Sequence, residues 1–144
     1  LLNILNDNPY YDKKNPKSLG REFFEKYQHQ IIDASNLPIN DLLATATEHI
    51  AYQIVKTTND LEKSKILITG GGAKNNFLIE RITDMSKHEI IIPDTVIIDY
   101  KEALIFAFLG TLKMEGKVNV LSSVTGASSD SSSGNIYLPE NNIH

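Results

Sequence analysis

The chain has 144 residues, 41% of them hydrophobic, so it is long enough to bury a core of its own. Its formal net charge of −4 and the lack of any run of Lys or Arg argue against a nucleic-acid-binding surface. No apolar stretch approaches the roughly 20 residues that a membrane span needs. The chain contains no cysteine, so it offers no disulfide and fits a reducing cytoplasm.

The first part of the chain predicts helices. Residues 1–16 are rich in Asn, Asp and Pro and predict an irregular lead-in segment. Ser18 is a candidate N-cap for a first helix, and a second helix is predicted over residues 40–57. The apolar residues expected to be buried are Phe23, Phe24, Tyr27 and Ile31 in the first helix, and Leu43, Ala46, Ile50 and Ile54 in the second.

Three consecutive glycines lie in the middle of the chain. A β-branched run at 65–69 predicts a strand that ends at Gly70, Gly71 and Gly72, and a helix is predicted over 75–86. Such a turn lets a ligand come close to the backbone, and a helix that starts behind it directs free N–H groups toward the same place. This arrangement suits a phosphate or a nucleotide. A tight turn without a ligand explains the glycines equally well at this point.

A second strand is predicted at Ile90–Ile92, and it should lie parallel to the first because a helix connects them. Asp99 and Glu102 have the spacing of a capping box, which predicts a helix that carries Phe106 and Phe108 into the core.

Two strands are too few for a stable parallel sheet. The sequence offers only weak further strands, at 96–98 and 118–124. The sheet is therefore expected to be completed by residues outside this chain or by a second copy of it. The chain is expected to form a single partial domain over 1–144, with a mobile Ser-rich stretch at 128–134. No metal site is predicted, because His29, His49, His88 and His144 do not have the spacing of zinc ligands.

Six separated segments form one ordered set across nearly the whole chain. They are Asn8–Tyr11, Pro16–Phe24, Gly70–Asn75 with the following Phe77 and Leu78, Asp99–Ala103, Phe106–Leu109 and Val124–Ala127. Together they resemble the C-terminal part of the anhydro-N-acetylmuramic acid kinase family, and the segment Pro-Lys-Ser-x-Gly-Arg-Glu-Phe-Phe is the most specific. Leu19 and Lys74 depart from the usual Thr and His of that family, and Asn119–Leu121 is a looser form of its Gly-Asn-Leu-Pro turn.

The resemblance implies an α/β fold, namely the C-terminal lobe of a two-lobe actin-like (ribonuclease H-like) kinase. In that lobe helices pack on a small parallel sheet, which is incomplete in this chain. The implied reaction is ATP- and Mg²⁺-dependent phosphorylation of 1,6-anhydro-N-acetylmuramic acid, with hydrolytic ring opening to the 6-phosphate, in peptidoglycan recycling. The family's catalytic and metal-binding residues lie in an N-terminal part that these residues do not contain. No catalytic residue is therefore expected here, and the isolated chain is expected to be inactive.

The resemblance also implies which residues lie near the ligands. The three glycines would pass close under the nucleotide. Asn75 either contacts the nucleotide or caps the following helix. Glu102 either contacts the sugar or an ordered water, or only caps the predicted helix, and the capping role explains it without any ligand. The expected nucleotide-binding residues are Gly70, Gly71, Gly72, Ala73 and Asn75, and the expected substrate residue is Glu102.

Two other functions remain open from the sequence. The pattern Gly70-x-Gly72-x-x-Asn75 approximates the fingerprint of a dinucleotide-binding oxidoreductase, and Asp94 lies where a ribose-binding acid would sit. Against this, the third glycine is absent and two helices precede the first strand. The remaining alternative is a non-catalytic actin-like binding module.

Overall fold

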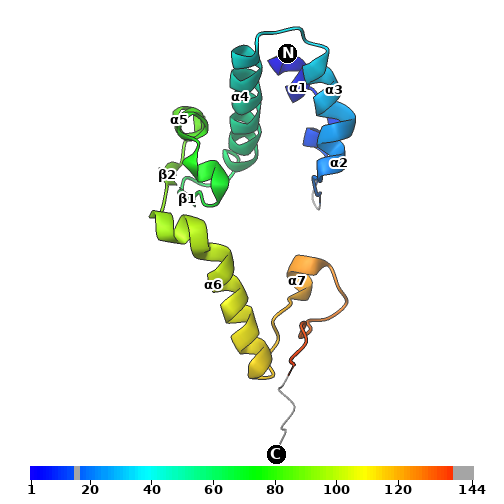
Figure 1. Ribbon diagram of the computed structural model, residues 1–144, viewed down its shortest axis with the longest axis vertical. Helices are drawn as coiled ribbons and strands as arrows, with labels where there is room; N and C mark the ends of the chain where they lie inside the picture. Colours follow the sequence, from blue (N-terminus) through cyan, green and yellow to red (C-terminus); the bar gives the residue numbers. More distant parts are fainter. Residues whose placement is uncertain (15–16, 138–144) are drawn as a thin grey trace, which may run out of the picture. The chain divides into compact units, whose positions relative to one another are not determined.

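The computed structural model describes residues 1–14 and 17–137. The chain divides into two compact units, Leu1–Asp94 and Thr95–His144 (Figure 1). The expectation of one partial domain over 1–144 stays a prediction.

Unit 1 begins with two short helical segments, α1 (Leu2–Asn6) and the 3₁₀ helix η1 (Pro9–Asp12). The prediction of irregular structure for the start of the chain is wrong for α1, which packs on the helix α4 (Ile39–Thr58) and buries Leu5, which is 2% exposed. The turn η1 starts where the Asn8 side chain accepts a hydrogen bond from the Tyr10 N–H at 2.9 Å. Asn and Pro are typical of such a helix start, so these residues favour a short helix rather than an irregular segment.

The first predicted helix consists of three short pieces, α2 (Arg21–Phe23), the π-helix η2 (Phe24–Gln28) and α3 (His29–Asp33). The prediction of Ser18 as its N-cap is wrong, because Gly20 occupies the N-cap position. Phe23 is half-buried and its ring lies 4.8 Å from that of Tyr10. The predicted burial of Phe24 and Tyr27 is wrong, since their side chains are 42% and 44% exposed.

The second predicted helix is confirmed as α4 (Ile39–Thr58), but its buried face differs from the predicted one. Leu43 and Ile50 are 61% and 48% exposed, whereas Ala46 and Ile54 are half-buried. The buried residues are His49, Ala51 and Val55. They are buried because α4 has neighbours on more than one side: α1 contacts it, and so does α5 (Asn76–Met85).

A strand–helix–strand unit follows, as predicted. Strand β1 (Lys65–Leu67) pairs in parallel with β2 (Glu89–Ile91), with Ile66 opposite Ile90, and α5 lies between them in the sequence. The core of unit 1 joins this sheet to α4 and α5. It consists of Ala51, Val55 and Ile82, with Ile54, Ile68, Leu78, Met85 and Ile90 packed against them.

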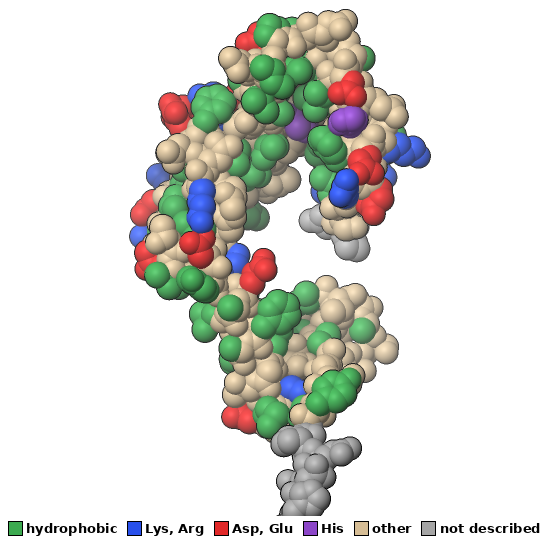
Figure 2. Space-filling model, viewed as in Figure 1, with side chains coloured by type: hydrophobic (Ala, Val, Ile, Leu, Met, Phe, Trp, Pro, Cys, Tyr) green, Lys and Arg blue, Asp and Glu red, His purple; other side chains and the backbone are tan. Residues whose placement is uncertain are grey.

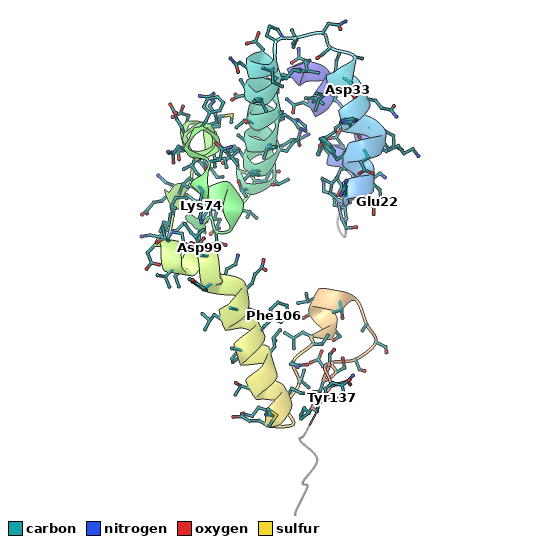
Figure 3. The ribbon with its side chains drawn as sticks, viewed as in Figure 1. Glu22, Asp33, Lys74, Asp99, Phe106 and Tyr137 are labelled. Carbon is teal, nitrogen blue, oxygen red and sulfur yellow. The ribbon has the colours of Figure 1, made fainter. Side chains whose placement is uncertain are left out.

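Unit 2 contains the long helix α6 (Thr95–Met114) and the short α7 (Ser122–Thr125). Because α6 begins at Thr95, residues 96–98 are helical and not a strand. Phe106, labelled in Figure 3, is 70% exposed and Phe108 is 61% exposed, so their predicted core positions are wrong. No residue of α6 is buried within the described structure. Residues 118–124 contribute one antiparallel bridge, between Val120 and Ser131, rather than a strand.

The described chain is thus mostly helical, with one small parallel sheet of two strands. Hydrophobic side chains (green in Figure 2) remain visible on the surface of both units. Within residues 1–14 and 17–137, no helix is long and apolar enough to cross a membrane.

Candidate functional site

The glycine turn joins β1 to α5 in unit 1. Gly70 has φ +82° and ψ −175°, a backbone conformation that residues other than glycine rarely adopt. A single 3₁₀ turn, η3 (Gly71–Lys74), follows directly, and the Ala73 N–H donates to the Gly70 carbonyl at 3.0 Å. Lys74, labelled in Figure 3, is the last residue of this turn. The backbone itself therefore requires glycine at position 70.

The backbone conformation does not require glycine at positions 71 and 72. Neither has a positive φ. A Cβ at Gly71 would meet no heavy atom of the described chain within 4 Å, and at Gly72 the nearest would be Leu78 Cδ2 at 3.8 Å, an ordinary contact. Both residues are exposed. The fold of this chain therefore tolerates a methyl group at either position, and the surface above both residues is open.

Ala73 and Asn75 support the turn rather than extend into the open surface. Ala73 is 6% exposed, so its methyl group is part of the packing of unit 1. The Asn75 side chain accepts a hydrogen bond from the Leu78 N–H at 3.1 Å, which makes it the N-cap of α5. Of the two roles considered for Asn75, the capping role is therefore confirmed. Contact with a nucleotide stays a prediction.

A two-pronged ion pair holds α5 against α4. Arg81 donates to Glu48 from Nε at 2.6 Å and from Nη2 at 3.1 Å. Its third nitrogen, Nη1, donates to Asp84 at 2.9 Å. Both partners of the main pair are mostly covered, with side chains 30% and 26% exposed. The hydrogen bond from Arg81 holds the pKa of Glu48 below its usual value, against the opposing effect of burial. Sequence inspection missed this pair, because the two residues are far apart in the chain.

His88 connects the end of α4 to the starts of the two strands. It is 6% exposed, its Nε2 lies 2.8 Å from the Thr58 carbonyl at the end of α4, and its Nδ1 accepts from the Ser64 N–H at 3.1 Å. An imidazole with one donor and one acceptor position thus fixes α4, the start of β1 and the start of β2. The hydrogen bonds of His88 thus tie the ends of these elements together.

Glu102 lies on α6, in unit 2. The expected capping box is wrong, because Asp99 and Glu102 lie one and two turns inside a helix that begins at Thr95. Glu102 is exposed, and a capping role no longer explains it.

Among residues 1–14 and 17–137, no group of three His, Cys, Asp or Glu side chains is placed to hold a metal ion. His144 lies outside the described residues. The exposed backbone at Gly71 and Gly72 has no side chain above it, which allows a flat ligand to approach closely. The described residues do not include a set of ligands for Mg²⁺.

Comparison with known proteins identifies relatives of this chain. A profile described as AnmK, anhydro-N-acetylmuramic acid kinase, matches residues 1–139. A protein of that name from Francisella tularensis subsp. novicida is 39% identical over 139 residues, which cover 90% of this chain and 36% of the relative. One from a Sulfurovum species is 33% identical over 142 residues, covering 96% of this chain and 39% of the relative. One from Saccharophagus degradans is 35% identical over 151 residues, covering 96% of this chain and 39% of the relative.

The chain therefore spans well under half the length of the curated relatives that it matches. The match itself extends over nearly all of the chain. The chain belongs to the anhydro-N-acetylmuramic acid kinase family.

Proposed function

We propose that this chain is the nucleotide-side part of an ATP-dependent kinase that phosphorylates 1,6-anhydro-N-acetylmuramic acid and opens its anhydro ring to give the 6-phosphate. Family membership and the names of the relatives support this proposal. We also propose that the chain is part of an actin-like lobe, and that peptidoglycan recycling in the cytoplasm is the setting of the reaction. The catalytic base and the Mg²⁺ ligands are then expected in the remainder of the enzyme.

The open backbone at Gly71 and Gly72 is the observation that carries the nucleotide assignment. Gly70 is explained by its positive φ, but the other two glycines are explained neither by their φ angles nor by packing within the described chain. Two glycines that the packing of the described chain does not need are accounted for by a ligand that lies against the backbone. The nucleotide is the ligand of a kinase that fits this position.

In the proposed enzyme this chain binds the nucleotide and orients it. Gly70 sets the direction of the turn, Ala73 and Asn75 anchor it to unit 1, and Gly71 and Gly72 provide the contact surface. ATP with Mg²⁺, when bound, supplies the phosphoryl group and neutralises charge during its transfer. Glu102, which does not cap α6, is the proposed polar contact to the sugar.

The test is the substitution Gly72→Val in the complete kinase of which this chain is proposed to be part. The valine side chain should occupy the space of the ligand, so ATP affinity measured by calorimetry should fall by more than about tenfold. Because the protein has room for a Cβ at this position, the thermal unfolding of the variant should stay close to that of the unmodified enzyme.

Gly72→Ala and Gly70→Ala are the matched controls. Gly72→Ala adds only a methyl group and should change the free energy of unfolding by no more than about 0.5 kcal/mol. Gly70→Ala places a side chain at φ +82° and should cost about 1–3 kcal/mol of stability. Unchanged ATP affinity in a folded Gly72→Val enzyme would show that the glycines form a turn and nothing more.

A further inference from the structure

A buried histidine connects the N-terminal segment of unit 1 to helix α4. His49 is 5% exposed and lies on α4. Its Nδ1 is 2.6 Å from Asn6 Oδ1 at the end of α1. Its Nε2 is 3.0 Å from the Tyr11 hydroxyl in η1 and 3.0 Å from Nε2 of Gln28, the last residue of the π-helix η2. One imidazole therefore contacts three separate elements that precede α4.

The partners of His49 specify a neutral ring. Asn6 Oδ1 accepts from Gln53 Nε2 at 3.0 Å as well as from His49, so His49 Nδ1 carries the proton in this arrangement. His49 Nε2 then accepts, and the side-chain nitrogen of Gln28 faces it as a donor. Gln28 also donates to the Tyr11 hydroxyl, which leaves that hydroxyl free to donate to His49. A second proton on the ring, at Nε2, would face the side-chain N–H of Gln28, so two donors would oppose each other.

The groups that hydrogen-bond to His49 in the described chain carry no negative charge. Its hydrogen-bond partners are the side chains of Asn6, Tyr11 and Gln28, all of them neutral, and burial lowers the pKa of His49 below its ordinary 6.5. Two of the acids on these elements have cationic partners of their own: Asp12 pairs with Lys56 at 2.9 Å, and Glu48 pairs with Arg81. The titratable groups on the elements around His49 are Asp7 beside α1, Tyr10, Tyr11 and Asp12 in η1, Glu25, Lys26 and Tyr27 in η2, Asp41, Glu48, Tyr52 and Lys56 on α4, and Glu80, Arg81 and Asp84 on α5.

We propose that His49 is a pH-sensitive latch that holds residues 1–33 on α4 when neutral and releases them when protonated. The π-helix supplies the element that moves. A π turn accommodates an extra residue, and its relaxation to an α-helical turn would rotate Gln28 away from His49. Such turns recur at functional sites of proteins.

The direction of the pH effect follows from the depressed pKa. The released segment binds a proton at His49 more readily than the docked segment does, so docking is favoured less as the pH falls. The attachment is complete above the ordinary histidine pKa of 6.5 and weakens as the pH falls from there toward the lower pKa of the docked state.

Hydrogen exchange of the chain at pH values from about 7.5 to about 5, corrected for the intrinsic exchange rate, tests the latch. Protection of amides in 1–33 should fall with decreasing pH, by up to about tenfold for each unit by which the pKa is depressed, while α5 keeps its protection. In His49→Gln, which has an amide donor and acceptor but no titration, protection should no longer depend on pH. His29→Gln, at a histidine whose side chain is 56% exposed, should behave like the unmodified chain.

A pH dependence that survives in His49→Gln overturns the proposal, and so does constant protection of 1–33 in the unmodified chain. If His49→Gln does not fold, NMR titration of the imidazoles in the unmodified chain decides the question. The latch requires the His49 signals to titrate below 6.5 together with the loss of the Tyr11 contact; titration at or above 6.5 with that contact intact rules it out.

Discussion

The three glycines of the turn differ in why the position holds a glycine. Gly70 is required by a backbone conformation with φ +82°. Gly71 and Gly72 lie in an ordinary 3₁₀ turn with room for a Cβ, so the packing of the described chain does not require their small size. A run of identical residues thus combines one position that serves the fold with two that we assign to ligand binding.

Asn75 allows the capping and ligand roles to be separated. Asn75→Ala removes the hydrogen bond to the Leu78 N–H and should lower the free energy of unfolding by about 1 kcal/mol, measured by urea denaturation. Asn75→Asp keeps an oxygen acceptor for the cap and should retain the stability. If the folded Asn75→Asp protein also keeps its nucleotide affinity, Asn75 is a cap and not a ligand contact.

At the scale of elements, the pairing of α4 with α5 positions the glycine turn. The core residues Ala51, Val55 and Ile82 come from these two helices, and the Glu48–Arg81 pair ties them together. Since α5 begins directly behind the turn, a shift of α5 on α4 would move the proposed nucleotide surface.

Glu48→Gln tests this ion pair through its pH dependence. The pKa of Glu48 is lower in the folded state than its ordinary value of 4.5, so the pair stabilises the fold above that pH, and this contribution is lost as the pH falls through the folded-state pKa. The variant should have a lower urea midpoint at neutral pH and a smaller decrease of that midpoint between about pH 5 and pH 3. Glu25→Gln, which breaks the exposed pair with Arg21, should leave the midpoint nearly unchanged at every pH.

Helix α6 differs from α4 in its distribution of apolar residues. Large apolar side chains on α6 are exposed on more than one face, and the structure of unit 2 covers none of its residues fully. A helix that is apolar on all sides is typical of a protein interior. The prediction that the Phe residues of α6 lie in a core therefore failed for this chain, because a core needs covering elements as well as apolar residues.

At the scale of the whole molecule, the isolated chain should have no kinase activity. In-line phosphoryl transfer needs a group that orients the nucleophile and a metal–phosphate clamp. The proposed function places both outside this chain, and the described residues contain no acidic cluster for a metal. Incubation of the pure chain with ATP and the anhydro sugar should give no phosphorylated product. A product that depends on both compounds would contradict the proposal that the catalytic groups lie outside this chain.

We also expect the isolated chain to associate. A parallel sheet of two strands leaves backbone groups unpaired at its edges, and several exposed apolar side chains favour contact with a second copy. Sedimentation at tens of micromolar, roughly the range of weak association, should show a dimer or a larger species. Phe106→Ser removes one of the most exposed aromatic rings and should weaken this association. A monomer at all concentrations would show that these surfaces do not pair.

The sequence by itself determined the elements that depend on local pattern. Helical spacing of apolar residues predicted α4 and α5, the β-branched runs predicted both strands, and their connection by a helix predicted the parallel pairing. The motifs and their order predicted the family. These features follow from neighbouring residues, so no contact between distant parts of the chain was needed to infer them.

Only the tertiary structure decided which faces are buried and which polar groups meet. Leu43 and Ile50 fit the helical pattern of a buried stripe, but the neighbours of α4 cover His49, Ala51 and Val55 instead. The capping box at Asp99 has the right spacing, yet the apolar residues before it extend α6 to Thr95. The contacts of His49 join residues up to 43 positions apart. Spacing along the chain records local geometry, whereas burial and polar pairing depend on which elements the fold brings together.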